Sequence, residues 1–282
     1  MFNKADRIKE NLRSEMYPSI FCLGCGIGNV LNYTLRAIDE CRLDFDKLVF
    51  LSGIGCSSRL PGYIDAEGLH TTHGRALTFA TGVKLAKPEL SVIIFTGDGD
   101  CAGIGGNHFI HAARRNIDMT VICVNNSIYG LTGGQDAPTT PVGALTRTTP
   151  YGKISYPFNL SLIAIANGAT FCARYTVFEY VQLAKVIGRA MNHQGFSFIE
   201  VISNCHVNFG RRNNLGDSVA MREMYKKVRV RMKPEEIGLD YHKTDIKFEP
   251  GKGFTRIPTG IFLEEKDVPE EFSERIIDAY SK

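Results

Sequence analysis

The sequence lacks long apolar runs, a strong net charge, internal repeats and low-complexity segments. No run approaches the roughly 20 apolar residues that a membrane-spanning helix needs. Residues 1–18 are charged throughout and contain no apolar signal core, so we expect a cytoplasmic protein without membrane contact. The net charge is only +3 and most basic residues are scattered, which argues against nucleic acid as a partner.

What is present describes an ordinary globular protein. Hydrophobic residues make up 44% and charged residues 22% of the 282 residues, which is usual for a soluble domain. From residue 211 the apolar pattern fades after one helical segment, and prolines recur at 234, 250, 258 and 269. We expect one large α/β domain at 1–210 and a C-terminal extension at 211–282 that packs on the core or on a partner subunit.

The chain is organised around a Gly-Asp-Gly-Asp turn at 97–100. Apolar residues at 92–95 precede this turn, a helix-like segment follows it, and a second apolar run at 121–124 ends in two asparagines. This pattern predicts strand, turn, helix and strand, with Asp98 and Asn126 at the carboxyl ends of two strands. Ligands of open α/β sheets bind at that edge. Carboxylate and amide oxygens suit Mg²⁺, and the glycines let backbone N–H groups approach a phosphate, so a magnesium diphosphate is the expected guest.

The rival interpretation is that the Gly-Asp-Gly sequence only forms a tight turn between a strand and a helix. The asparagine pair decides between the two, because Asn126 follows Asp98 by 28 residues, at the end of a predicted strand. That spacing resembles the thiamine-diphosphate motif, and a motif is supported by its structural context.

Further elements follow from apolar periodicity. Strands are expected at 48–51 and 196–202, a short helix and a strand within 160–175, and helices at 4–14, 29–39, 177–193 and 217–231.

Eight cysteines in a chain without an export signal are not expected to form disulfides. Four lie in apolar or helical stretches and are interpreted as core residues: Cys41, Cys101, Cys123 and Cys172. The other four lie beside glycines or just past strands: Cys22, Cys25, Cys56 and Cys205. If these converge, they could hold zinc or a [4Fe–4S] cluster; one Cys-x-x-Cys pair with two distant single cysteines favours the cluster.

Several motifs together resemble the β subunit, which binds thiamine diphosphate, of 2-oxoacid:ferredoxin oxidoreductases. The similarity covers roughly residues 15–215 and rests on CLGCGIG, GIGCSSRLPGY, HTTHGRA, TGDGDCAGIGGNHFIHAARRNID, NNSIYGLTGGQDAPTT and NCHVNFGRRNN, in that order. It implies a three-layer α/β fold with a mostly parallel sheet.

The resemblance also implies a set of site residues. Cys22, Cys25, Cys56 and Cys205 would ligate one [4Fe–4S] cluster. Asp98, the amide of Asn126 and the carbonyl of Ile128 would hold Mg²⁺. The cofactor would be lined by Ile54, Gly55, Cys56, Ser57, His73, Gly99, Asp100, Gly130 and Leu131. His73, at a strand-to-helix junction, is a candidate contact for phosphate or substrate; the alternative is an ordinary hydrogen-bonded histidine.

The activity implied is oxidative decarboxylation of a 2-oxoacid with coenzyme A as acyl acceptor, the electrons passing through the cluster to ferredoxin. A non-redox thiamine lyase and a zinc-bearing scaffold subunit are the alternatives. Thiamine enzymes generally need an activating glutamate, and no residue of this chain is assigned that role. In the family it lies on the α subunit, so we expect an αβ partner and an (αβ)₂ assembly, with or without additional small ferredoxin-like subunits.

The substrate is suggested by two motifs that resemble the 2-oxoglutarate branch, GCSSRLPGY and FGRRNN. Arg59 in the first motif could pair with the distal carboxylate of 2-oxoglutarate through a bidentate contact, or could form a surface salt bridge. Pyruvate and branched-chain 2-oxoacids remain alternatives.

Overall fold

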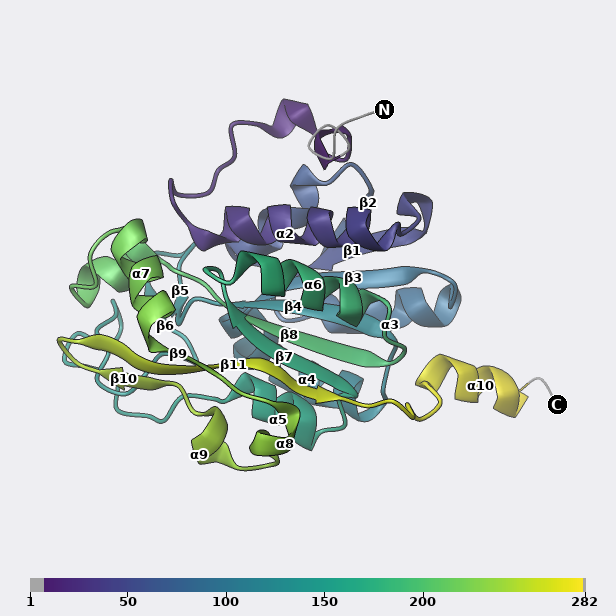
Figure 1. The fold of residues 1–282 in the computed structure, drawn as a ribbon. Coiled ribbons are helices and arrows are strands. Elements are labelled where there is room, and N and C mark those ends of the chain that lie inside the picture. The colour runs from purple at the N-terminus through teal and green to yellow at the C-terminus, as the bar shows by residue number, and fades with distance from the viewer. Residues whose placement is uncertain (1–7, 281–282) are drawn as a thin grey trace.

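The computed structural model describes residues 8–280, drawn as a ribbon in Figure 1. Of the helix expected at 4–14, residues 8–10 are helical and residues 4–7 lie outside the described residues. The helix does not continue to 14, because Leu12 pairs with Ile64 in an isolated bridge. Within 8–280, nine strands form one sheet in the order β10-β11-β7-β8-β4-β3-β1-β2, and β9 pairs with β11. None of the helices in this range is both long and apolar enough for a membrane span.

The centre of the sheet is parallel because apolar strands alternate with crossover helices. Six strands run parallel to one another: β1 (Leu48–Ser52), β2 (Glu67–His70), β3 (Ser91–Gly97), β4 (Met119–Asn125), β7 (Phe171–Thr176) and β8 (Phe196–Ile202). Every residue of β4, β7 and β8 is buried, as expected for strands covered on both faces. A separate two-stranded ribbon consists of β5 (Ile128–Tyr129) and β6 (Gln135–Asp136).

Helices cover both faces of the sheet, which makes three layers (Figure 1). On one face, α2 (Gly26–Cys41) and α6 (Tyr180–Met191) pack together, with Leu31 and Ile187 in an apolar core. On the other face lie α3 (Ala76–Ala86), α4 (Gly106–Arg114) and α5 (Leu160–Ala166), with Ala80, Phe109 and Ala164 in a second core. The predicted three-layer α/β fold is confirmed.

Shorter and later elements complete the chain. They are 3₁₀ helices at Ser14–Met16, Phe45–Lys47 and Ser57–Tyr63, π-helical turns at Gly99–Ile104 and His206–Gly210, helices α7 (Ser218–Val228), α8 (Pro234–Ile237), α9 (Tyr241–Thr244) and α10 (Phe272–Tyr280), and strands β9 (Arg229–Arg231), β10 (Lys247–Glu249) and β11 (Gly253–Glu264).

The segment after residue 210 is built into the sheet, a feature that the sequence did not predict. β11 pairs antiparallel with β7, and its Phe254 and Ile257 join the same apolar core as α2. Pro258 lies inside β11, and proline normally argues against a strand assignment because it cannot donate a ladder hydrogen bond. The strands expected at 48–51, 92–95, 121–124 and 196–202 are present, and so are the helices expected at 29–39 and 177–193. The helix expected at 217–231 is present as α7 but ends at Val228, because Arg229–Arg231 form β9, which pairs with β11. The domain boundary at residue 210 stays a prediction.

Candidate active site

The parallel strands bring the predicted site residues to one edge. In the order β8-β4-β3-β1-β2, the segments that follow these strands carry Cys205, Asn126, Asp98, Cys56 and His73. Parallel strands all end at the same edge of a sheet, and that edge is where α/β folds bind ligands. Residues distant in sequence therefore become neighbours.

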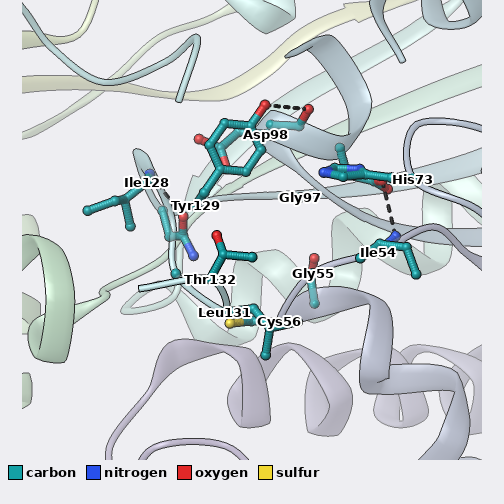
Figure 2. Close-up of a pocket in the computed structure, with 15 residues that line it drawn as sticks. Ile54, Gly55, Cys56, His73, Gly97, Asp98, Ile128, Tyr129, Leu131 and Thr132 are labelled. Carbon is teal, nitrogen blue, oxygen red and sulfur yellow. Dashed lines mark hydrogen bonds and ion pairs between the residues drawn. The ribbon is translucent and has the colours of Figure 1, made fainter. Parts of the chain in front are cut away.

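One cavity at this edge, of about 70 Å³, contains the predicted cofactor-binding and magnesium-binding residues (Figure 2). We call it the cofactor pocket. Its lining comprises Ile54, Gly55, Cys56, Ser57, His73, Asp98, Gly99, Asp100, Asn126, Ile128, Gly130 and Leu131, all predicted, together with Gly97, Tyr129 and Thr132.

Asp98 provides a buried carboxylate that lacks a counter-charge. Its exposure is 2%, and among residues 8–280 no ion pair to it is observed. The hydroxyl of Thr139 donates to its Oδ2. Burial raises the pKa of Asp98 to about 7, although that hydrogen bond opposes the shift. A buried carboxylate at this cost suits a bound cation, which would restore the charge balance.

Asn126 and Ile128 supply further oxygen atoms beside Asp98. The side-chain Oδ1 of Asn126 accepts the backbone N–H of Ile128 at 3.2 Å, which leaves a second lone pair on the amide oxygen. Both residues line the cofactor pocket with Asp98. The set consists of a carboxylate, an amide oxygen and a backbone carbonyl, the hard ligands that Mg²⁺ prefers.

Asp100 ties three loops together. Its Oδ1 lies 2.6 Å from Nδ1 of His73 and accepts the backbone N–H groups of Gly74 at 2.7 Å and Ile54 at 3.1 Å. Its Oδ2 accepts the hydroxyl of Thr96 at 2.7 Å. The contact with Nδ1 orients the imidazole of His73. Asp100 itself is 3% exposed and therefore adds little surface to the pocket. The His73 side chain is 35% exposed and can meet a ligand.

Tyr129 is a pocket residue that sequence reasoning missed. Its hydroxyl donates to the carbonyl of Gly99 at 3.1 Å. A Cβ on Gly99 would lie 2.1 Å from the tyrosine ring, and a Cβ on Gly103 would lie 2.3 Å from its hydroxyl. Burial, with the nearby charge of Asp98, raises the pKa of Tyr129 to about 12. The glycines at 99 and 103, which leave room for the ring, were the available signal.

A second cavity, of about 190 Å³, is lined by Cys22, Cys25, Cys56 and Cys205, and we call it the cysteine cavity. Burial raises the pKa of Cys25 to about 11 and of Cys56 to about 12, and neighbouring cysteines add to both shifts. The free thiols of Cys25 and Cys56 are therefore protonated at neutral pH. In the described part of the chain, no group of three or more His, Cys, Asp or Glu is arranged to hold a single metal ion.

The two cavities adjoin each other. Four residues line both: Cys56, Asn126, Gly130 and Leu131, which we call the shared wall. A Cβ on Gly130 would lie 3.4 Å from Sγ of Cys56 and 3.7 Å from Sγ of Cys205, so the backbone approaches both sulfurs closely. Arg59 is exposed and borders the cysteine cavity, not the cofactor pocket.

The cysteines predicted to be structural mostly lie in the core. Cys101, Cys123 and Cys172 are fully buried. Cys41 is half-buried at the end of α2, where its sulfur lies against Gly188 of α6.

Comparisons with known proteins agree with this geometry. The family model "Thiamine pyrophosphate enzyme, C-terminal TPP binding domain" matches residues 53–201, which carry the cofactor pocket. The 2-oxoglutarate synthase subunit KorB of Methanothermobacter marburgensis is 50% identical over 241 residues, 82% of this chain and 85% of that protein. The subunit of the same name from Archaeoglobus fulgidus is 47% identical over 266 residues, 94% of this chain and 91% of that protein. The chain belongs to the β-subunit family of 2-oxoacid:ferredoxin oxidoreductases.

A solved structure of this enzyme class contains a chain that shares the fold over nearly the whole length of the chain described here. The structure is a 2-oxoglutarate:ferredoxin oxidoreductase from Magnetococcus marinus with 2-oxoglutarate, coenzyme A and succinyl-CoA bound. It superposes with a TM-score of 0.83 at 32% identity, covering 98% of this chain and 90% of that one. A β subunit implies an enzyme of several subunits, and hence an α partner.

Proposed function

We propose that this β subunit serves in the oxidative decarboxylation of a 2-oxoacid, with 2-oxoglutarate favoured. Coenzyme A would accept the acyl group, CO₂ would leave, and ferredoxin would receive the electrons. The names of the relatives and the ligands named for the Magnetococcus marinus structure support this substrate class. Pyruvate and branched-chain 2-oxoacids are the alternatives for the same site.

The observation that carries the proposal is the shared wall between the cofactor pocket and the cysteine cavity. An oxidoreductase needs an electron acceptor close to its organic cofactor, and a non-redox thiamine lyase has no use for a cavity with four cysteines. The wall is thin at Gly130, where backbone takes the place of a side chain. This arrangement favours the oxidoreductase over the lyase.

Thiamine diphosphate, when bound, would supply a carbon nucleophile for the 2-oxo carbon of the substrate, and its ring would stabilise the electron pair left when CO₂ departs. The residues of this chain fit its diphosphate end. Asp98, the Asn126 amide and the Ile128 carbonyl would hold Mg²⁺, and the buried Asp98 would gain the counter-charge that it lacks. His73, oriented by Asp100, would contact phosphate or substrate.

Cys22, Cys25, Cys56 and Cys205 would hold one [4Fe–4S] cluster. Each cysteine of such a cluster binds its own iron, so the sulfurs lie farther apart than the ligands of one zinc ion. Four cysteines around one cavity, from one Cys-x-x-Cys pair and two distant single positions, fit the cluster better. Bound iron would hold the sulfurs as thiolates, a form that burial alone disfavours at Cys25 and Cys56.

The α partner would complete the cofactor pocket. Of the described residues that line the pocket, none is a glutamate, so the activating carboxylate would come from another chain. We propose an αβ unit assembled as (αβ)₂ in the cytoplasm, with or without small ferredoxin-like subunits. Arg59 would meet the distal carboxylate of the substrate only if the substrate extends past Leu131 toward the cysteine cavity.

Anaerobic co-production with the α subunit tests the proposal. The purified complex should contain iron and reduce ferredoxin when 2-oxoglutarate, coenzyme A and thiamine diphosphate are all present. Pyruvate and a branched-chain 2-oxoacid are run in parallel as competing substrates. A complex that contains zinc but no iron, or that decarboxylates without reducing an acceptor, would refute the oxidoreductase.

A further inference from the structure

A buried ion pair lies in the sheet next to β4, the strand that leads into residues 125–128. We call these residues the metal-binding turn, because they include the proposed Mg²⁺ ligands Asn126 and Ile128. Arg174 of β7 and Glu200 of β8 are register partners, and each side chain is 1% exposed. The Arg174 Nε donates to Oε2 of Glu200 at 2.8 Å. Glu200 is also the register partner of Cys123 in β4, two residues before the end of that strand.

Both terminal nitrogens of Arg174 donate to other segments of the chain. One terminal nitrogen donates to the carbonyl of Thr244 in α9 at 2.6 Å, and the other donates to Oδ1 of Asn159 at 2.9 Å. On the carboxylate, Oε2 also accepts the hydroxyl of Ser161 at 2.6 Å. The second oxygen, Oε1, is thereby left for one further donor.

That donor is Asn125, the last residue of β4. Its Nδ2 donates to Oε1 of Glu200 at 2.7 Å, and its Oδ1 accepts the backbone N–H of Ser127 at 3.1 Å. A carboxylate can only accept, so Glu200 forces the amide nitrogen toward itself and the amide oxygen toward Ser127. Ser127 has a positive φ of 61°, and its carbonyl accepts the hydroxyl of Thr140 at 2.7 Å.

We infer that Glu200 is a positioning residue for the metal-binding turn, acting through Asn125 on the backbone that presents Asn126 and Ile128. The inference rests on the proposed function, because those two residues are its proposed Mg²⁺ ligands. Arg174 neutralises Glu200, and Thr244 ties the C-terminal segment to the same network. Partners behind metal ligands commonly fix the orientation of the ligands.

A role in stability alone is the competing explanation. Replacing a buried ion pair by apolar side chains of similar volume often leaves stability unchanged, whereas removing one partner leaves a buried charge. Double substitutions therefore avoid a lone charge. They also let the acceptor for Asn125 be removed or kept.

The experiment compares two double variants in the αβ complex. Arg174→Met with Glu200→Leu removes the acceptor for Asn125. Arg174→Met with Glu200→Gln is the matched control, because glutamine keeps an oxygen for Asn125. The measurement is the Mg²⁺ concentration that gives half-maximal thiamine diphosphate binding in calorimetry. We expect an increase of about 10-fold or more for the leucine double, as for other partners of metal ligands, and a requirement near that of the natural complex for the glutamine double.

Equal Mg²⁺ requirements in both folded doubles would overturn the inference. If the leucine double fails to fold, Asn125→Ala in the otherwise natural chain replaces it, with the same expected increase; an unchanged requirement there would also overturn the inference. Failure of the proposed function is visible separately, since the natural complex would then show no Mg²⁺-dependent thiamine diphosphate binding at all.

Discussion

Replacing Gly99 by alanine should displace Tyr129 into the cofactor pocket. The new Cβ would lie 2.1 Å from the ring, whereas ordinary contacts begin at 3.4 Å, so the ring must retreat by about 1.3 Å. Tyr129 lines the pocket, and its ring meets His73 edge-on with centroids 6.0 Å apart. A retreat therefore takes volume from a cavity of only about 70 Å³.

The expected loss is in cofactor affinity. Overpacking of this kind costs about 1–3 kcal/mol, which corresponds to a roughly 5- to 150-fold weaker binding of thiamine diphosphate. Calorimetry on the αβ complex at saturating Mg²⁺ measures it. Gly106→Ala is the matched control, because a Cβ at Gly106 has no neighbour within 4 Å and neither glycine has a positive φ.

A double variant separates the clash from other effects of the alanine. With Tyr129→Ala, the ring that meets the new Cβ is gone, so Gly99→Ala should cost nothing further. The double should bind the cofactor as tightly as Tyr129→Ala alone, a strongly non-additive result. Affinity within twofold of the natural complex for Gly99→Ala, or additive losses in the double, would refute the reasoning.

Five further predictions concern the metal sites, the stability of the chain and the substrate. Cys205→Ser should abolish the about four iron atoms that one [4Fe–4S] cluster brings, as measured by iron analysis; full iron content would exclude Cys205 as a ligand. Gly130→Leu should block iron incorporation because its side chain must pass the sulfurs of Cys56 and Cys205, whereas Gly130→Ala should be tolerated with its Cβ at 3.4 and 3.7 Å from them; equal iron in both would contradict the close approach. Burial raises the pKa of Asp98 from 3.8 to about 7, so this carboxyl group is mostly protonated at about pH 6 and mostly ionised at about pH 8. Mg²⁺ binding should therefore release close to one proton per chain at about pH 6 and almost none at about pH 8. Calorimetry in buffers of different ionisation enthalpy measures this release. The same shift makes the cofactor-free chain less stable as pH rises from about 4 to about 7, because the folded form keeps a proton that the unfolded form releases. If 2-oxoglutarate extends past Leu131 so that its distal carboxylate meets Arg59, Arg59→Gln should raise KM for 2-oxoglutarate by about tenfold, the worth of one charge-assisted contact, and leave KM for pyruvate unchanged. An unchanged KM for 2-oxoglutarate, or a parallel rise for both substrates, would remove Arg59 as the partner of the distal carboxylate.

The sequence could predict the position of the site because parallel strands impose it. Apolar runs at 48–51, 92–95, 121–124 and 196–202 mark four strands, and the polar residues or cysteines that follow each must meet at one edge. The position of Cys205 just past the strand at 196–202 made it one of the candidate ligands, and the family resemblance implied that it joins the other three cysteines.

Other features depend on contacts between segments that are distant in sequence, which local sequence patterns do not encode. The place of Tyr129 follows from two glycines on a different loop, and the link from Glu200 to Asn125 exists only after β4 and β8 have paired. β11 was missed because a proline interrupts its pattern and because its pairing partner β7 lies far upstream. Arg59 is near Cys56 in sequence, yet its side chain borders the cysteine cavity only.

The shared wall has an evolutionary consequence. Each residue of the shared wall lines two cavities: Cys56, Asn126, Gly130 and Leu131. A substitution there that adapts the cofactor pocket to a new 2-oxoacid therefore also changes the cysteine cavity. Positions that border one cavity only, such as Thr132 on the cofactor side and Val207 on the cysteine side, are free of that double constraint. We expect members of the family with different substrates to diverge at such positions while the wall stays the same.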